Sequence, residues 1–129
     1  MRIFLVGLSD AFARSVVRYL GADQRIELCG VAPDTALAGI MLPVTRAALA
    51  LVDWSALGPM PGPGLRSLRA SSPGLWIACV VDDAAGYREQ AFGAGANAVI
   101  SQQRFADEIE PLLLHVFGMG HPMRGRPYG

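Results

Sequence analysis

Five short apolar runs, separated by segments of mixed polarity, dominate the pattern of the chain. They cover residues 3–6, 26–31, 48–52, 76–81 and 97–100. Runs of this length are typical of strands buried on both faces. The second run differs, because Glu27 gives it an alternation that suits an edge strand. Strands that alternate with helices form a parallel sheet with right-handed crossovers. The pattern therefore predicts an α/β fold with one doubly wound, five-stranded parallel sheet and five helices.

The segments between these runs have helical spacing. We expect helices at about 10–20, 34–42, 65–70, 84–92 and 106–117. Ser9 or Asp10 can cap the first helix, and Asp34 can cap the second. Pro43 is expected to end the second helix, and Pro111 lies inside the last one. The Pro/Gly-rich segment 58–64 is expected to be a stiff loop.

Length and composition fit one domain followed by a tail. Of the 129 residues, 52% are hydrophobic and 17% are charged, which is enough apolar material for one dense core. We expect the domain to span residues 1–117 and a flexible, Gly/Pro-rich tail to span 118–129. No apolar run approaches the roughly 20 residues of a membrane span, and no signal peptide is recognisable. The expected location is the cytoplasm, without a membrane partner.

The charge balance argues against nucleic acid as a partner. Eleven basic residues offset eleven acidic ones, so the formal net charge is zero. A neutral chain has no electrostatic attraction to nucleic acid or to an anionic membrane. It also has little charge repulsion to prevent self-association.

Common catalytic and metal-binding motifs are absent from the sequence. Cys29 and Cys79 lie inside apolar runs and are expected to be small buried side chains rather than a disulfide or metal ligands. His115 and His121 have no ligand cluster around them. No serine lies in a Gly-x-Ser-x-Gly elbow, and no glycine-rich segment forms a nucleotide-binding loop. The sequence therefore favours a protein that is not an enzyme.

Three segments carry a resemblance to a known family. They are Leu49–Asp53, 60–65 (Met-Pro-Gly-Pro-Gly-Leu) and 95–97 (Gly-Ala-Asn). With the order of strands and helices, they resemble the CheY-like receiver domain of bacterial response regulators, over about residues 1–117. Residues 26–32 resemble the second strand of the NarL/FixJ/LuxR-type subgroup. The resemblance implies a flavodoxin-like sheet of strand order 2-1-3-4-5 and a role in two-component signal transduction, including phosphorelays.

The resemblance also implies a phosphorylation site, of which this chain keeps one group. Asp53 matches the aspartate that accepts a phosphoryl group. The other site positions are Gly7 and Leu8 for the acidic pair that holds Mg²⁺, Val80 (or Val81) for the hydroxyl, and Gln102 for the lysine. Transfer to a carboxylate needs a metal and a cation to neutralise the accumulating charge. The site is therefore expected to be dismantled, with no Mg²⁺ and no other cofactor.

Two carboxylates could replace the missing ligands. Asp10 and Asp82 are the candidates for unusual Mg²⁺ ligation, although each is more simply explained as a helix cap. Asp53 itself is either a hydrogen-bonded carboxylate that caps the next loop or a retained regulatory residue. Trp54 is either a lid over the site or part of an interface.

Three functional hypotheses remain open at this stage. The first is a pseudo-receiver that signals through protein contacts without aspartyl phosphorylation. The second is a phosphoacceptor with Asp53 phosphorylated by means of non-standard metal ligands. The third is a small-molecule sensor that uses the emptied pocket beside Leu8 and Val80.

For the pseudo-receiver, the expected contact surface combines the fourth helix, the fifth strand and the fifth helix. It would bind a protein partner or a second copy of the chain. The candidate residues are Tyr87, Arg88, Phe92, Val99, Phe105, Ile109 and Leu113, and they form an interface if they are exposed. Val99 also occupies the position of the family's aromatic switch residue.

Overall fold

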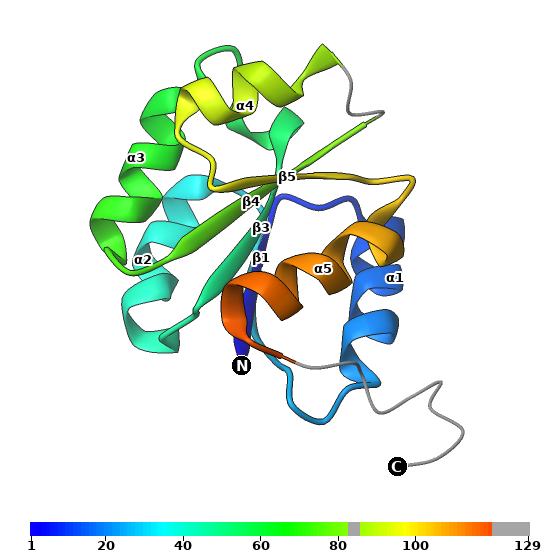
Figure 1. Cartoon of the computed structure of the whole chain (residues 1–129). Helices are drawn as coiled ribbons and strands as arrows, with labels where there is room; N and C mark the ends of the chain where they lie inside the picture. The colour runs from blue at the N-terminus through cyan, green and yellow to red at the C-terminus, as the bar shows by residue number, and fades with distance from the viewer. Residues whose placement is uncertain (83–85, 120–129) are drawn as a thin grey trace.

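The five apolar runs form the five strands of one parallel sheet (Figure 1). The structure is a computed structural model that describes residues 1–82 and 86–119. The strands are β1 (Arg2–Val6), β2 (Glu27–Ala32), β3 (Leu49–Asp53), β4 (Trp76–Val81) and β5 (Ala98–Ser101). Their order in the sheet is β2-β1-β3-β4-β5. This order and the parallel pairing confirm the predicted fold.

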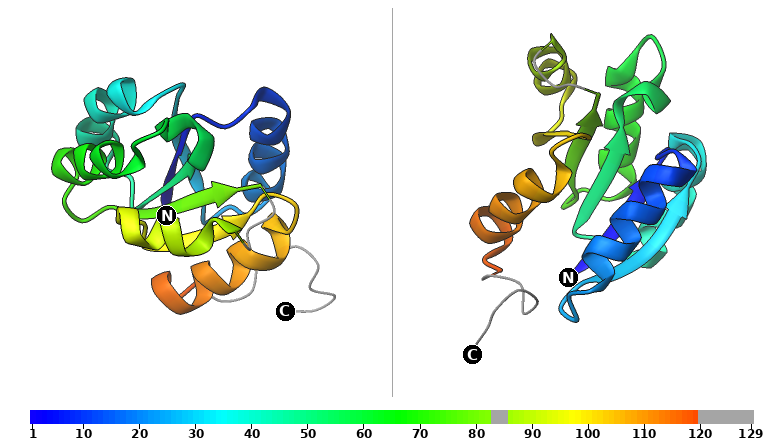
Figure 2. Two further views of the ribbon diagram at one scale, coloured as in Figure 1. Left: turned by 90° about the horizontal axis from the view of Figure 1, so that it is seen from above. Right: turned by 90° about the vertical axis from the view of Figure 1, so that its right-hand side faces the viewer.

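Helices cover both faces of this sheet. They are α1 (Asp10–Gly21), α2 (Thr35–Thr45), α3 (Pro61–Ser71), α4 (Arg88–Ala94) and α5 (Phe105–Phe117), with a short 3-10 helix η1 (Trp54–Leu57) after β3. The helices α2, α3 and α4 lie on one side of the sheet, and α1 and α5 lie on the other (Figures 1 and 2).

Successive strand residues divide the core between these two sides, because side chains alternate along a strand. Val52 and Cys79 face the side of α2, α3 and α4. Leu51 and Val80 face the side of α1 and α5. Both sets are fully buried, which explains why the central strands contain continuous apolar runs.

Two predicted caps are present at the helix starts. Ser9, and not Asp10, caps α1, because its Oγ accepts a hydrogen bond from the backbone N–H of Phe12 at 3.3 Å. Asp34 caps α2 by accepting from the N–H of Leu37 at 2.9 Å. Asp10 is instead the first residue of α1, with an exposed side chain.

Prolines interrupt the helices less than the sequence predicted. Pro43 was expected to end α2, but the helix continues to Thr45. Pro43 is exposed and lies near the C-terminal end, so its ring removes one hydrogen bond without disturbing the buried face. The expected loop 58–64 is also partly wrong, because α3 begins at Pro61. A proline in the first turn loses no intrahelical bond.

Some predicted features lie outside the described residues. These include residues 84 and 85 of the predicted fourth helix, residues 120–129 of the predicted tail, and His121. In the described part, α4 begins at Arg88. Cys29 and Cys79 form no disulfide with each other; Cys79 is buried and Cys29 is partly buried. None of the helices in the described ranges has both the length and the hydropathy to cross a membrane.

Of the seven residues predicted for the contact surface, three are exposed and four are buried. Tyr87, Arg88 and Phe92 are exposed on or beside α4, as expected. The remaining candidates are core residues, and their exposed fractions are 6% for Val99, 7% for Phe105, 0% for Ile109 and 7% for Leu113.

The burial of these four residues has a simple physical reason. Phe105, Ile109 and Leu113 are spaced four residues apart, so they share the face of α5 that packs on the sheet. The ring of Phe105 packs edge-on against Phe12 at 5.5 Å. Val99 lies on the other side of the sheet, in the same core cluster as residues of α4.

Candidate functional site

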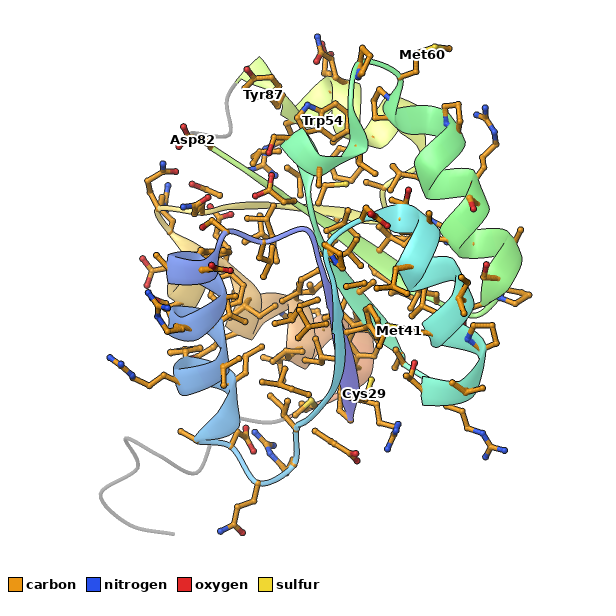
Figure 3. All side chains as sticks on the ribbon, turned by 180° about the vertical axis from the view of Figure 1, so that it is seen from behind. Cys29, Met41, Trp54, Met60, Asp82 and Tyr87 are labelled. Atoms are coloured by element: carbon orange, nitrogen blue, oxygen red, sulfur yellow. The ribbon has the colours of Figure 1, made fainter. Side chains whose placement is uncertain are left out.

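Three neighbouring strands end at a cleft of about 340 Å³. Asp53 is the last residue of β3, Asp82 follows β4, and Gln102 follows β5. The residues that line the cleft are Asp53, Trp54, Ser55, Val80, Asp82, Tyr87 and Gln102. Figure 3 shows Trp54, Tyr87 and Asp82 at this end of the molecule. The carboxyl ends of parallel strands are where open α/β sheets bind ligands.

The carboxylate of Asp53 holds the segment that follows it. Its Oδ1 accepts hydrogen bonds from the backbone N–H of Ser55 at 2.9 Å and from the Ser55 hydroxyl at 2.7 Å. Asp53 is thereby the N-cap of η1, because a short carboxylate side chain reaches the backbone two residues ahead. The interpretation of Asp53 as a capping carboxylate is confirmed.

The backbone at Gly7 leaves no room for a side chain. Its φ is +71°, in the left-handed region that favours glycine. A Cβ at this position would lie 2.3 Å from the Cβ of Ala56 in η1. The N–H of Gly7 donates to the carbonyl of Ala32 at 2.8 Å and fixes the turn. A side chain at this position would therefore have to displace Ala56 and strain the backbone.

The other predicted metal positions do not converge on Asp53. Leu8 packs against the core below α1 and α5 and is not among the residues that line the cleft. Asp10 is also absent from that lining. Of the two residues expected beside an emptied apolar pocket, Val80 lines this cleft and Leu8 does not.

Asp82 lines the cleft and is not the N-cap of α4. Its Oδ1 accepts a hydrogen bond from the side-chain amide of Gln103. The interpretation of Asp82 as a cap of α4 is wrong, because that helix begins at Arg88, after Tyr87 at its N-cap. The bond links the segment after β4 to the segment after β5.

The position of the missing hydroxyl falls on Val80 rather than Val81. Val80 lines the cleft, whereas Val81 faces the opposite side of the sheet, in the core with α2, α3 and α4. Gln102 lines the cleft and donates its N–H to the carbonyl of Val81 at 2.8 Å. Trp54 forms part of the wall and packs partly on the core, as the lid interpretation requires.

The charge of the cleft is negative. The described residues that line it include two carboxylates and neither lysine nor arginine. Next to it, burial raises the pKa of the Cys79 thiol to about 12, and the charge of Asp53 adds to the rise. The thiol is thus held in its neutral form. No three His, Cys, Asp or Glu residues in the described ranges are grouped to hold a metal ion.

Solved structures share this arrangement of strands and helices. The signal receiver domain of the response regulator NarL from Mycobacterium tuberculosis superposes with a TM-score of 0.75. The match has 20% identity and covers 92% of this chain and 97% of that chain. The fold is that of a receiver domain.

Two further structures match over nearly the same span. The receiver domain of RcsB from Escherichia coli has a TM-score of 0.77 at 12% identity, with 92% of this chain and 93% of that chain covered. A structure of the CheA3 P1 domain in complex with CheY6 from R. sphaeroides contains a chain with a TM-score of 0.74 at 14% identity, covering 92% and 97%. No protein-family model and no curated protein matches the sequence.

The sequence reasoning missed η1, which determines the geometry of the cleft. Ser55 and Ala56 had no assigned role, yet one binds Asp53 and the other closes the position at Gly7. The Asp-x-Ser spacing was the available signal, since aspartate commonly caps a turn two residues ahead.

Proposed function

We propose that this chain is a receiver domain of a two-component pathway that acts through protein contacts, without Mg²⁺-dependent phosphorylation of Asp53. Such a domain is a pseudo-receiver, and it is not an enzyme. The observation that carries the proposal is the closed position at Gly7, where the resemblance implies the first metal-binding carboxylate. The receiver fold of the chain supports the signalling role.

The described residues do not fit a resident Mg²⁺ ion. Mg²⁺ prefers octahedral oxygen coordination and usually takes one or two carboxylates. Asp53 and Asp82 line the cleft, but an oxygen of each already accepts hydrogen bonds, from Ser55 and Gln103 respectively. We therefore propose no metal and no other cofactor for the site.

A phosphoryl group on Asp53 would also lack a neutralising cation. Gln102 is neutral, and the cleft's described residues bring a second carboxylate, that of Asp82, instead of a positive charge. Charge that builds up in the transfer would be opposed rather than stabilised, and one fixed donor is often worth about 3 kcal/mol. Losing both the metal and the lysine makes conventional transfer from a kinase very slow.

We propose that the partner of this chain is a protein. A similar chain occurs in the structure of the CheA3 P1 domain in complex with CheY6, a contact between two proteins. The chain is neutral overall, so we propose no nucleic acid partner. Tyr87, Arg88 and Phe92 on or beside α4 remain exposed for contact.

Intact-mass spectrometry after incubation with Mg²⁺ and acetyl phosphate tests the proposal. We expect the protein to keep its original mass, while a working receiver domain treated in parallel gains one phosphoryl group. Asp53→Ala is the matched variant. A phosphoryl mass that appears in the wild type and is lost in Asp53→Ala would overturn the pseudo-receiver function and support the phosphoacceptor alternative.

The role of Asp82 in that alternative can be separated from the role of Asp53. If a phosphoryl group is gained, Asp82→Asn is the next variant, because it keeps the shape and the bond from Gln103 but removes the charge. Loss of the modification would identify Asp82 as a metal ligand. Retention would place the ligands elsewhere.

A small-molecule sensor is the second candidate, and the cleft itself favours it. Its volume of about 340 Å³ lies at the lower end of ordinary ligand pockets, and Trp54 and Tyr87 offer aromatic surface. A ligand in the cleft would change the fluorescence of Trp54 and raise the unfolding temperature. The same ligand should have no effect on a Gln102→Phe variant, whose larger side chain fills part of the cleft.

A further inference from the structure

The helix α2 presents a fully apolar face to solvent. Its exposed residues are Ala36, Leu37, Ile40, Pro43 and Val44. The exposed fractions are 74% at Ile40 and 81% at Val44. The opposite face of the same helix is buried through Ala38 and Leu42. No residue from Thr35 to Thr45 is charged, so α2 is apolar all round while only one side is covered, which is unusual for a monomer.

The spacing of these exposed residues is that of a helix-pairing seam. Leu37, Ile40 and Val44 are separated by three and four residues, which places them on one stripe of the helix. Met41 instead packs partly on the core beside the sheet (Figure 3). The stripe is therefore free to meet a second helix without disturbing the fold.

Charges at the two ends of α2 specify the partner. Asp34 lies at its N-terminal end and Arg46 at its C-terminal end, and both are exposed. Ile40 is the midpoint between these two positions. If two copies of α2 pair antiparallel about a two-fold axis, Ile40 meets Ile40, and Leu37 lies opposite Pro43, next to Val44. Asp34 of each copy then lies at the end where the other copy has Arg46.

We propose that α2 is a self-association surface, on which a second copy of this chain docks antiparallel with Ile40 at the two-fold axis. The zero net charge of the chain leaves no long-range repulsion between copies. A membrane-surface helix would carry lysines and arginines along its polar face, and α2 has none. The surface differs from the one formed by α4, β5 and α5 that the sequence suggested.

The size of the surface sets the strength of the dimer. An 11-residue helix is about 16 Å long. One such face from each copy buries less than the roughly 1,200–2,000 Å² of a stable specific interface. The dimer is therefore concentration-dependent, with monomer and dimer in exchange.

Sedimentation velocity over a wide concentration range tests the proposal directly. We expect the wild-type chain to shift from monomer to dimer as concentration rises. Ile40→Glu places two like charges at the axis and should raise the dimer Kd by about tenfold or more. Val17→Glu, on an exposed position of α1, is the matched control and should leave the Kd unchanged. Circular dichroism confirms that both variants remain folded.

The charged ends provide a second test. Arg46→Asp places two carboxylates near each other and should raise the Kd by about two- to fivefold. Adding Asp34→Asn to Arg46→Asp removes that repulsion and keeps an N-capping side chain. The double variant should therefore bind more tightly than Arg46→Asp alone. A Kd that does not recover would overturn the antiparallel arrangement.

Cysteine crosslinking locates the axis. In a Cys29→Ser background, Ile40→Cys should form a disulfide-linked dimer under mild oxidation, because only residues near a two-fold axis meet their own copies. Val17→Cys in the same background should remain monomeric.

Several results would overturn the proposal. One is a wild-type chain that stays monomeric at every concentration, and this result counts against the proposal even if another molecule binds α2. Another is a dimer that survives Ile40→Glu but is lost in Phe92→Glu, since this would assign the contact to α4. The self-association surface rests on the proposed function for one point, that the chain signals through protein contacts. Oligomeric mass and phosphoryl mass are separate readouts, so either can fail alone.

Discussion

Replacing Gly7 with alanine adds one methyl group at the position where the resemblance implies a metal-binding carboxylate. Two separate costs follow from the structure. The φ of +71° places alanine in the left-handed region, at about 1–2 kcal/mol. The new Cβ would also lie 2.3 Å from the Cβ of Ala56, and relief of such overlap typically costs about 1–3 kcal/mol. We expect Gly7→Ala to lower the free energy of unfolding by about 3 kcal/mol in total.

Two other glycines in the chain separate these costs. Gly118 has a similar φ, +68°, in the left-handed region, with no atom within 4 Å of its Cβ position. Gly118→Ala should therefore cost only the backbone strain, about 1–2 kcal/mol. Gly74 has open space and no positive φ, so Gly74→Ala should be neutral or slightly stabilising.

Urea unfolding, followed by the fluorescence of Trp54 and Trp76, measures all of these variants. Adding Ala56→Gly to Gly7→Ala removes the overlap and should restore about 1–2 kcal/mol beyond additivity in a double-mutant cycle. If Gly7→Ala costs no more than Gly118→Ala, or if the cycle shows no coupling, Ala56 does not close this position. A carboxylate at position 7 would then be sterically possible, and the main support for the pseudo-receiver would be lost.

Three further outcomes follow from the described contacts. Ellman's reagent should titrate Cys29 in the native protein but not Cys79, whose pKa is raised to about 12 by burial. Because this folded-state pKa lies above the unfolded value, Cys79 contributes stability below about pH 9, and that stability is lost as the pH rises from about 9 to about 12. Ile109→Ala should lower the free energy of unfolding by about 2–5 kcal/mol in urea, since Ile109 is fully buried. Phe92→Ala, at a half-exposed position, should lower it by less than about 1 kcal/mol. Equal losses would contradict the assignment of α5 to the core. Arg69→Ala removes bonds to two backbone carbonyls and a side-chain amide and should cost about 2 kcal/mol, and Arg69→Lys should recover less than half of it if the forked geometry matters.

Most of the fold was predictable because strand burial leaves a direct record in the sequence. Each of the five apolar runs became a strand within one or two residues, and the order of elements restricted the topology. The errors occurred where tertiary packing overrides local signals. Pro43 remains in α2, because burial of Leu42 beside it outweighs one lost hydrogen bond.

The candidate site was predictable in its residues but not in its shape. Asp53, Val80 and Gln102 do line one cleft, since the strand ends bring them together. The closure at Gly7 was not predictable, because it depends on η1 and on Ala56, a residue with no chemical signature. Four of the seven interface candidates are buried for a related reason. Apolar residues at helical spacing on α5 are equally typical of a buried face, and only the structure shows which face is covered.

The short helix η1 lies between the closed position at Gly7 and helix α3, on which the start of α2 also packs. Asp53 caps its first turn, and Ala56 fills the space at Gly7. At its other end Leu57 is buried beside the start of α2: a Cβ built at Gly64 would lie 3.1 Å from Leu57 Cδ2 and 3.5 Å from Thr35 Cγ2.

Asp53, which the resemblance assigns to phosphate chemistry, therefore has a structural role here. Through Ser55 it holds η1 in place, and Leu57 of η1 and Thr35 of α2 both lie against the Gly64 position of α3. Packed interiors transmit such constraints over a few residues because they contain little free volume. The bonds that occupy Asp53 thus help to fix η1 against α3, the helix on which α2 packs.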